Sequence, residues 1–236
     1  MPRDSKRNMD SIKMRTYFLI SGGSGGIGSE ICRLLVPIGI IPIVGYNSNE
    51  LYAEILAKET GGFSVKLDMS DFDSIKMAVQ TIEYKIGDDA ELAGIVLGAS
   101  SPPDLLPLTS LASNQLLSQF KITVLGSHFL ISILMKKFFR RAKKGTIIGI
   151  LTQAISNENK MPATGMGSYV IAKEALKSML SVLSVEHAWL KIRTVSPGFT
   201  KTDMLKVFDP RYFCLLYTSD AADDLLCVDL GGRRII

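Results

Sequence analysis

The sequence predicts an α/β fold in three layers, with a doubly wound parallel sheet between two layers of helices. Three observations lead to this prediction. Short apolar runs alternate with helical segments of ten or more residues, a glycine-rich turn follows the first apolar run, and 47% of the 236 residues are hydrophobic. Helical crossovers between strands are right-handed and place the strands parallel. The length suits one sizeable core rather than two domains.

The first part of the chain supplies four of the expected strands and three helices. Gly61-Gly62 is a good stop signal for the second helix. Pro42 is unfavourable in the second strand, because proline cannot donate a ladder hydrogen bond. The expected strands are 17–21, 40–45, 63–67 and 93–98, and the expected helices are 25–36, 51–60 and 71–86.

The second part of the chain continues the alternation after a proline-rich loop. We expect helices over 110–139 and 167–189, and strands over 146–151 and 192–195. Six strands in this pattern form a Rossmann-type sheet, which binds ligands at the carboxyl ends of its strands. Each motif described below follows a strand or begins the next helix.

Composition excludes several classes of protein. The formal net charge of +4 is too small to indicate a nucleic-acid partner, and no apolar run reaches the roughly 18 residues of a membrane span. Residues 1–15 are expected to be a basic, disordered tail without a secretory signal, so the expected location is cytoplasmic. Three scattered cysteines and two isolated histidines, His128 and His187, predict neither disulfides nor a metal site.

The glycine-rich turn is the first functional motif. It follows a strand and opens a helix, where glycines allow close approach of a pyrophosphate and the helix start offers unpaired N–H groups. The alternative is a flexible turn without a ligand. The residues expected to contact the cofactor here are Ser21, Gly22, Ser24, Gly25, Gly26, Ile27 and Gly28.

The ends of the second and third strands carry the next candidates. After the second strand come Tyr46, Asn47 and Ser48, and no acid occurs before Glu50. An acid at this place would hold the ribose of NAD and repel a 2′-phosphate, so the sequence favours NADP, with NAD as the alternative. Asp68 and Met69 end the third strand, and we expect both to be further cofactor contacts. Both segments also suit a simple turn or helix N-cap.

Tyr169 and Lys173 form the catalytic motif. At positions i and i+4 they share one face of a helix. A nearby ammonium group favours the phenolate and lowers the pKa of a tyrosine, which suits general acid–base chemistry near neutral pH. A tyrosine four residues before a lysine is common by itself, and it becomes significant together with the glycine-rich turn.

From about Thr16 to Met204, these motifs resemble the short-chain dehydrogenase/reductase family in its single-domain form, including members similar to 3-oxoacyl-ACP reductase. The resemblance implies that Tyr169 exchanges a proton with the substrate oxygen, and that Lys173 lowers the tyrosine pKa and holds the nicotinamide ribose. It also implies a homodimer or homotetramer. In the segment after the sixth strand, the implied cofactor contacts are Pro197, Gly198, Thr200 and Thr202.

The sequence departs from the family pattern at three places. The serine that binds the substrate oxygen falls on Thr152, with Gln153 and Ser156 as rivals. The asparagine of the fourth helix falls on Thr123, which cannot copy an amide, so the proton relay is in doubt. Of the Asn-Asn-Ala-Gly signature after the fourth strand only Ala99 is kept, within Leu97-Gly98-Ala99-Ser100, and Ala99 is an expected cofactor contact. We expect altered packing there rather than lost chemistry.

After Arg211 the sequence changes character. Residues 214–236 resemble the translation of DNA-sequencing adapters, so we expect a domain over 16–213 and a non-native tail over 214–236. The fold would then have six natural strands, and its final edge strand and substrate lid would be missing. The alternative is a divergent natural tail.

The motifs together predict an NADP-dependent carbonyl reductase or alcohol dehydrogenase for a small-molecule substrate. Tyr169 would be the proton donor and Thr152 the hydroxyl that binds the substrate oxygen. Thr123 motivates an alternative, a dinucleotide-binding protein with weak or no catalysis. A truncated fragment without a function of its own is a third hypothesis. A fatty-acyl thioester, a sugar and a steroid-like ketone remain equal candidates for the substrate.

Overall fold

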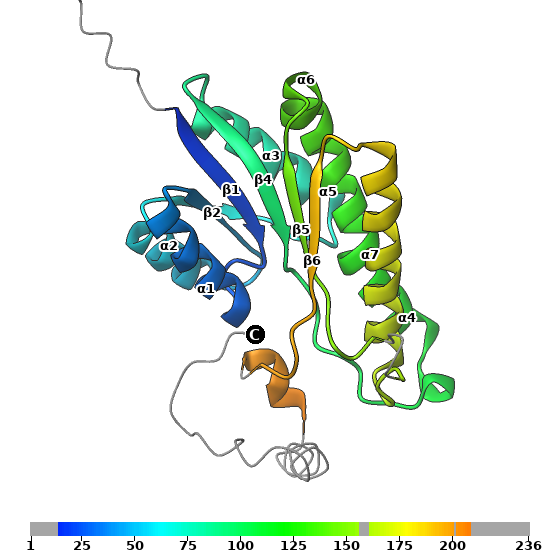
Figure 1. Cartoon of the computed structure of the whole chain (residues 1–236). Helices are drawn as coiled ribbons and strands as arrows, with labels where there is room; N and C mark the ends of the chain where they lie inside the picture. The colour runs from blue at the N-terminus through cyan, green and yellow to red at the C-terminus, as the bar shows by residue number, and fades with distance from the viewer. Residues whose placement is uncertain (1–13, 156–160, 201, 209–236) are drawn as a thin grey trace, which may run out of the picture.

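The computed structural model describes residues 14–155, 161–200 and 202–208 (Figure 1). Six parallel strands form one sheet in the order β3-β2-β1-β4-β5-β6. The predicted α/β class, the doubly wound order and the six strands are thereby confirmed. The strands are β1 (Arg15–Ser21), β2 (Ile41–Tyr46), β3 (Phe63–Lys66), β4 (Ala90–Leu97), β5 (Thr146–Ile150) and β6 (Lys191–Val195).

Both faces of the sheet are apolar. Successive side chains of a strand point to opposite faces, and in this sheet consecutive strand residues are apolar. In β1, Tyr17 and Leu19 belong to one buried cluster, and Phe18 and Ile20 belong to the other. The smaller cluster lies under α1 (Gly26–Leu35) and α2 (Glu50–Glu59). The larger cluster lies under α3 (Phe72–Ile86), a long central helix and α7 (Gly167–Glu186). Figure 1 shows α1 and α2 set apart from α5 and α7.

The long helix runs over Ser113–Ala142 and is continuous but not uniform. Its α-helical parts are α4 (Ser113–Phe120), α5 (Ser127–Leu134) and α6 (Arg140–Ala142), and π-helical turns join them over Lys121–Gly126 and Met135–Phe139. Length and composition alone would let this helix cross a membrane. Leu130, Leu134 and Phe139 are instead buried completely in the larger cluster, as in the core helix of a three-layer domain.

Pro42 is accommodated although β2 lies between β1 and β3. The pairing of β2 with β3 begins only at Ile43, so Pro42 precedes that ladder. Gly62, just before β3, lies against the Pro42 carbonyl, and a Cβ atom there would be 1.9 Å from the carbonyl oxygen. The two glycines therefore have different roles: Gly61, with a φ of +70°, suits the stop signal after α2, and Gly62 must be small because it packs on Pro42.

The glycine-rich turn connects β1 to α1 and packs directly on the end of β4. Gly22 has a φ of +69°, in the left-handed region, and a Cβ atom there would lie 2.9 Å from the Cα atom of Ala99. Both the dihedral angle and the space exclude a side chain at this position. The turn is thus fixed against the strand that precedes the Ala99-Ser100 segment. Of the tail predicted over 1–15, residues 1–13 lie outside the described residues and Arg15 begins β1, and the predicted tail over 214–236 also lies outside them.

Candidate functional site

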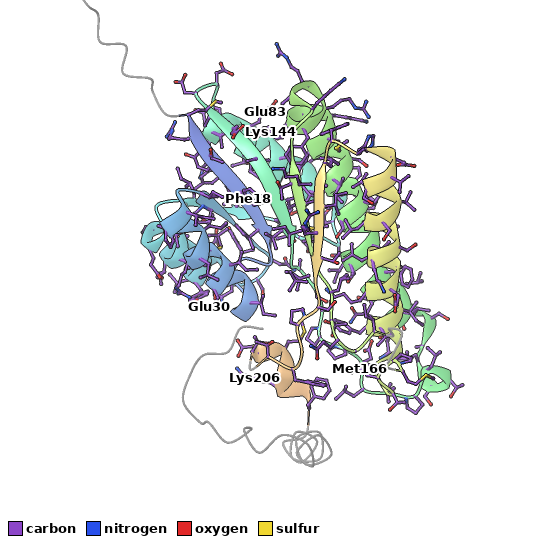
Figure 2. The ribbon with its side chains drawn as sticks, viewed as in Figure 1. Phe18, Glu30, Glu83, Lys144, Met166 and Lys206 are labelled. Carbon is purple, nitrogen blue, oxygen red and sulfur yellow. The ribbon has the colours of Figure 1, made fainter. Side chains whose placement is uncertain are left out.

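A cleft of about 920 Å³ lies at the carboxyl ends of the strands. In Figure 2, Met166 and Lys206 lie at this end of the molecule, and Glu83 and Lys144 lie at the opposite end. The cleft brings together most of the residues predicted for the site. They are Gly22, Ser24, Gly25, Gly26, Ile27, Gly28, Asn47, Ser48, Asp68, Met69, Ala99, Thr152, Tyr169, Lys173, Pro197, Gly198, Thr200 and Thr202.

Three predicted residues do not line the cleft. Ser21 is completely buried, and its hydroxyl bridges β1 and β4. Tyr46 packs in the smaller apolar cluster, and its hydroxyl donates a 2.5 Å hydrogen bond to Glu50. Thr123 is 1% exposed within a π-helical turn, and its hydroxyl oxygen has no hydrogen-bond partner in the described part of the chain. In each case the backbone carries the residue close to the site but directs its side chain into the interior.

The start of α1 has the properties of an anion-binding site. Its N-cap residue, Gly25, provides no side-chain hydrogen bond, and the first turn contains no acid. A Cβ atom on Gly26 would lie 2.5 Å from the Thr202 methyl carbon, so the chain after β6 closes over bare backbone. Unpaired N–H groups and the positive end of the helix dipole both favour a phosphate here. These residues therefore fit the pyrophosphate of a dinucleotide.

The ends of β2 and β3 form one wall of the cleft beside this turn. Asn47 receives hydrogen bonds from the Lys66 ammonium at both its backbone carbonyl and its side-chain oxygen, the latter at 3.0 Å. Lys66 ends β3 and is paired in register with Tyr46. The structure therefore places a positive charge where the local sequence of β2 has none.

Asp68 lines the same wall as a carboxylate. Its Oδ1 atom accepts hydrogen bonds from the backbone N–H and the hydroxyl of Ser70, at 2.8 and 2.7 Å. Burial raises the pKa of Asp68, but the hydrogen bonds from Ser70 and the nearby charges of Lys66 and Lys121 outweigh burial, so the pKa lies below its usual value. The helix N-cap next to it is Asp71, which accepts from the Asp73 backbone. The alternative N-cap role thus belongs to Asp71.

The other end of the cleft contains the Tyr169 phenol on the first turn of α7. The phenol has the side chains of Thr152, which follows β5, and Ser100, which follows β4, as neighbours that lower its pKa. Thr152 also accepts from the Ala154 backbone at 3.1 Å, which fixes its orientation. Its rival Gln153 is exposed, and Ser156 lies outside the described residues. Thr152 is therefore the hydroxyl that the fold places beside the tyrosine.

Lys173 lies one helical turn after Tyr169 and is only 1% exposed. Its ammonium donates a 2.8 Å hydrogen bond to the Ile150 carbonyl at the end of β5, and lies 5.6 Å from the centroid of the Tyr169 ring. Burial lowers the pKa of Lys173 to about 8, because a desolvated ammonium is disfavoured.

The lowering of the Tyr169 pKa by Lys173 stays a prediction, and burial acts on this pKa in the opposite direction. Burial raises the pKa of Tyr169 above its usual value, and the hydrogen bonds from Thr152 and Ser100 act in the opposite direction. The ammonium lies over the ring and is bonded to Ile150. Removal from water, which disfavours the phenolate, exceeds the stabilisation that the neighbouring groups provide.

The sequence did not indicate the roles of Ser100 and Lys66. Ser100 stands where the family signature has a glycine, so the pattern assigns it no side-chain function. Lys66 ends a strand that is distant in sequence from Asn47, where the ribose is expected to bind. Strand order alone could have drawn attention to both residues, since β4 neighbours β1 and β3 neighbours β2.

Comparison with known proteins agrees with this geometry. The sequence profile of the family described as short chain dehydrogenase matches residues 16–212, most of the chain. The chain belongs to the short-chain dehydrogenase family. It is therefore a family oxidoreductase, and its sheet order is the one expected for such a protein.

Individual relatives of this short-chain dehydrogenase are distant. Acetoacetyl-CoA reductase of Paracoccus denitrificans is 25% identical over 203 residues, which cover 84% of this chain and 79% of the relative. The 3-oxoacyl-[acyl-carrier-protein] reductase of Mus musculus is 26% identical over 199 residues, or 82% and 79% of the two chains. The fold is also that of a 3-ketoacyl-(acyl-carrier-protein) reductase from Brucella melitensis solved with NADH, with a TM-score of 0.74, 18% identity and coverage of 82% and 79%.

The buried ammonium predicts a pH dependence of stability. The pKa of Lys173 falls from 10.5 to about 8 on folding, so between these values the unfolded chain binds more protons than the folded one. Stability therefore rises with pH across this window, by about 3 kcal/mol in total. The measurement is urea unfolding at several pH values, comparing the parent with Lys173→Met. The unfolding free energy of the parent minus that of Lys173→Met should increase as pH rises. A difference that stays constant with pH would contradict the prediction.

Proposed function

We propose that this short-chain dehydrogenase binds NADP in preference to NAD and interconverts a carbonyl compound and its secondary alcohol. One observation carries the proposal. The Tyr169 phenol and the Thr152 hydroxyl lie at one end of a cleft whose other side is the open start of α1. A proton donor and an anion-binding helix end in one cleft suit a dinucleotide and a carbonyl group lying side by side.

The bound cofactor would supply hydride to the carbonyl carbon. The side chains supply binding and the proton. The Thr152 hydroxyl donates a hydrogen bond to the carbonyl oxygen and polarises it. The Tyr169 phenol gives its proton to that oxygen as negative charge develops there. Lys173, which lines the cleft beside Tyr169, is placed to hold the ribose next to the nicotinamide. In alcohol oxidation the proton returns to Tyr169.

The preference for NADP rests on the wall formed by β2 and β3. Asn47 and Ser48 line the cleft at the position where an acid would select NAD, and the Lys66 ammonium is bonded to Asn47. A cation attracts the 2′-phosphate that distinguishes NADP from NAD. NAD stays the alternative, since the related Brucella melitensis reductase was solved with NADH.

A 3-oxoacyl thioester is the first substrate class to test, because the Paracoccus and Mus relatives are named as reductases of such compounds. The second candidate function is dinucleotide binding with little catalysis, and it is favoured by the burial of Thr123 away from the cleft. An assay with acetoacetyl-CoA, fructose and estrone separates the two. Tight NADPH binding without oxidation of NADPH by any of these compounds would support the second function.

We also propose that the protein forms a homodimer or homotetramer through the long helix and α7. Leu125 on the long helix and Val182 and Val185 on α7 are 49%, 55% and 83% exposed. Apolar side chains on these helix faces gain stabilisation when a second copy covers them. A single monomeric species in light scattering would contradict this assembly.

Replacing Tyr169 with Phe removes the proton donor and keeps the ring. We expect turnover of a reduced probe to fall by roughly 100- to 10,000-fold, as loss of a general acid does, while the Kd for NADPH stays nearly unchanged. Tyr84→Phe is the matched control, because Tyr84 is 88% exposed on α3. Unchanged turnover in Tyr169→Phe, followed by NADPH absorbance, would refute the assignment.

Replacing Lys66 with Ala tests the cofactor preference. The Kd for NADPH should rise roughly 5-fold, which corresponds to an exposed ion pair of about 1 kcal/mol, and the Kd for NADH should stay constant. Lys58→Ala, another exposed lysine, should change neither value. Fluorescence titration of both cofactors gives the four constants. An equal loss of affinity for NADPH and NADH would exclude a 2′-phosphate contact.

A further inference from the structure

The catalytic tyrosine has two hydroxyl neighbours in this chain. Thr152 follows β5 and Ser100 follows β4, and both side chains line the cleft and act on the Tyr169 phenol as its neighbours. β4 and β5 are adjacent and parallel, so their carboxyl ends deliver the two hydroxyls to the same place. The proposed reaction uses Thr152 on the substrate oxygen. Ser100 has no part in the reaction as described so far.

The charge that remains on Tyr169 after proton transfer needs a donor. The Lys173 ammonium lies over the ring, 5.6 Å from its centroid, and donates one hydrogen bond to the Ile150 carbonyl at 2.8 Å, while the proposed function assigns its other N–H groups to the ribose. Thr152 is required by the substrate oxygen at the same moment. A hydroxyl has a single proton to donate. The Ser100 hydroxyl is therefore the donor that remains for the phenolate.

The position of Ser100 is fixed by the backbone before it. The Ser21 hydroxyl accepts hydrogen bonds from the N–H groups of Gly98 and Ala99, at 3.1 and 3.3 Å, and donates to the Val96 carbonyl at 3.2 Å. Within its own turn, Ser100 has only a long 3.4 Å contact with the Ser101 carbonyl, which competes weakly for its proton. A donor held on a fixed turn stabilises a developing charge without reorganisation.

We propose that Ser100 is a catalytic residue, whose hydroxyl donates a hydrogen bond to the Tyr169 phenolate oxygen after the phenol has protonated the substrate oxygen. This inference rests on the proposed function. No bond to Ser100 forms or breaks. The phenol O–H bond of Tyr169 breaks, the O–H bond of the product alcohol forms, and the negative charge left on the phenol oxygen is stabilised by the Ser100 O–H group. In alcohol oxidation the same contact favours the phenolate that accepts the proton.

Ionisation of Tyr169 measures this contact without any substrate. The full chain is labelled with ¹³C at the Cζ atoms of its tyrosines, and the Tyr169 signal is assigned by comparison with Tyr169→Phe. A hydrogen bond to a charged group changes the equilibrium constant for ionisation by about tenfold or more. We expect the phenolate-to-phenol ratio of Tyr169 in Ser100→Ala to be about tenfold lower than in the parent at each pH where circular dichroism shows the native fold.

Two further variants give the result its specificity. Ser100→Thr keeps a hydroxyl and should restore the ionisation of Tyr169. Ser101→Ala removes the neighbouring hydroxyl of the same cleft and should leave the ionisation unchanged. An unchanged ratio in Ser100→Ala, or an equal change in Ser101→Ala, would overturn the proposal.

A kinetic measurement separates this inference from the proposed function. With acetoacetyl-CoA and NADPH, Ser100→Ala should lower kcat about tenfold, with a small change in KM, because the contact forms only as charge develops. Turnover that persists unchanged in Ser100→Ala overturns the role of Ser100 and leaves the proposed function standing. If no probe is reduced although Tyr169 ionisation shifts in Ser100→Ala, the reductase function is wrong and the contact is real.

Discussion

The Ser21 hydroxyl is the constraint on which both ends of the site depend. It lies at the carboxyl end of β1, where the strand order reverses between β1 and β4, and it bridges the two strands by three hydrogen bonds. On one side the chain continues into the glycine-rich turn, where Gly22 leaves no space for a side chain against Ala99. On the other side it continues into the turn that carries Ser100. One buried hydroxyl therefore fixes the distance between the anion-binding helix end and the catalytic end.

Burial sets the electrostatics of the catalytic end. It raises the pKa of the Tyr169 phenol and lowers that of the Lys173 ammonium, so both side chains shift towards their neutral forms. At neutral pH the shift of Lys173 costs stability, whereas the shift of Tyr169 keeps the phenol protonated and able to donate. Local hydrogen bonds oppose the shift at Tyr169, and they come from two adjacent strands. The acid strength of Tyr169 thus reflects the tertiary fold rather than the spacing of Tyr169 and Lys173.

The sequence predicts well where a residue's function is carried by its backbone or its local spacing. The strands and helices follow from apolar periodicity, the glycine-rich turn from its own residues, and Tyr169 and Lys173 from their separation by one helical turn. The sequence does not predict whether a side chain points into the cleft or into the interior. Ser21, Tyr46 and Thr123 stand in the right segments, yet their side chains point into the interior. Ser100 and Lys66 were missed because neighbouring strands bring them to the site, and the π-helical turns of the long helix have no sequence signal of their own.

We propose that one cleft joins hydride transfer from a nicotinamide to protonation by Tyr169. The most direct test uses NADPH that carries deuterium at the transferable position of nicotinamide C4, with acetoacetyl-CoA as the first carbonyl compound. Mass spectrometry of the alcohol product should show one deuterium on the former carbonyl carbon, while its hydroxyl proton exchanges with solvent. Consumption of the labelled NADPH without deuterium in the product, or deuterium released to water, would contradict the account.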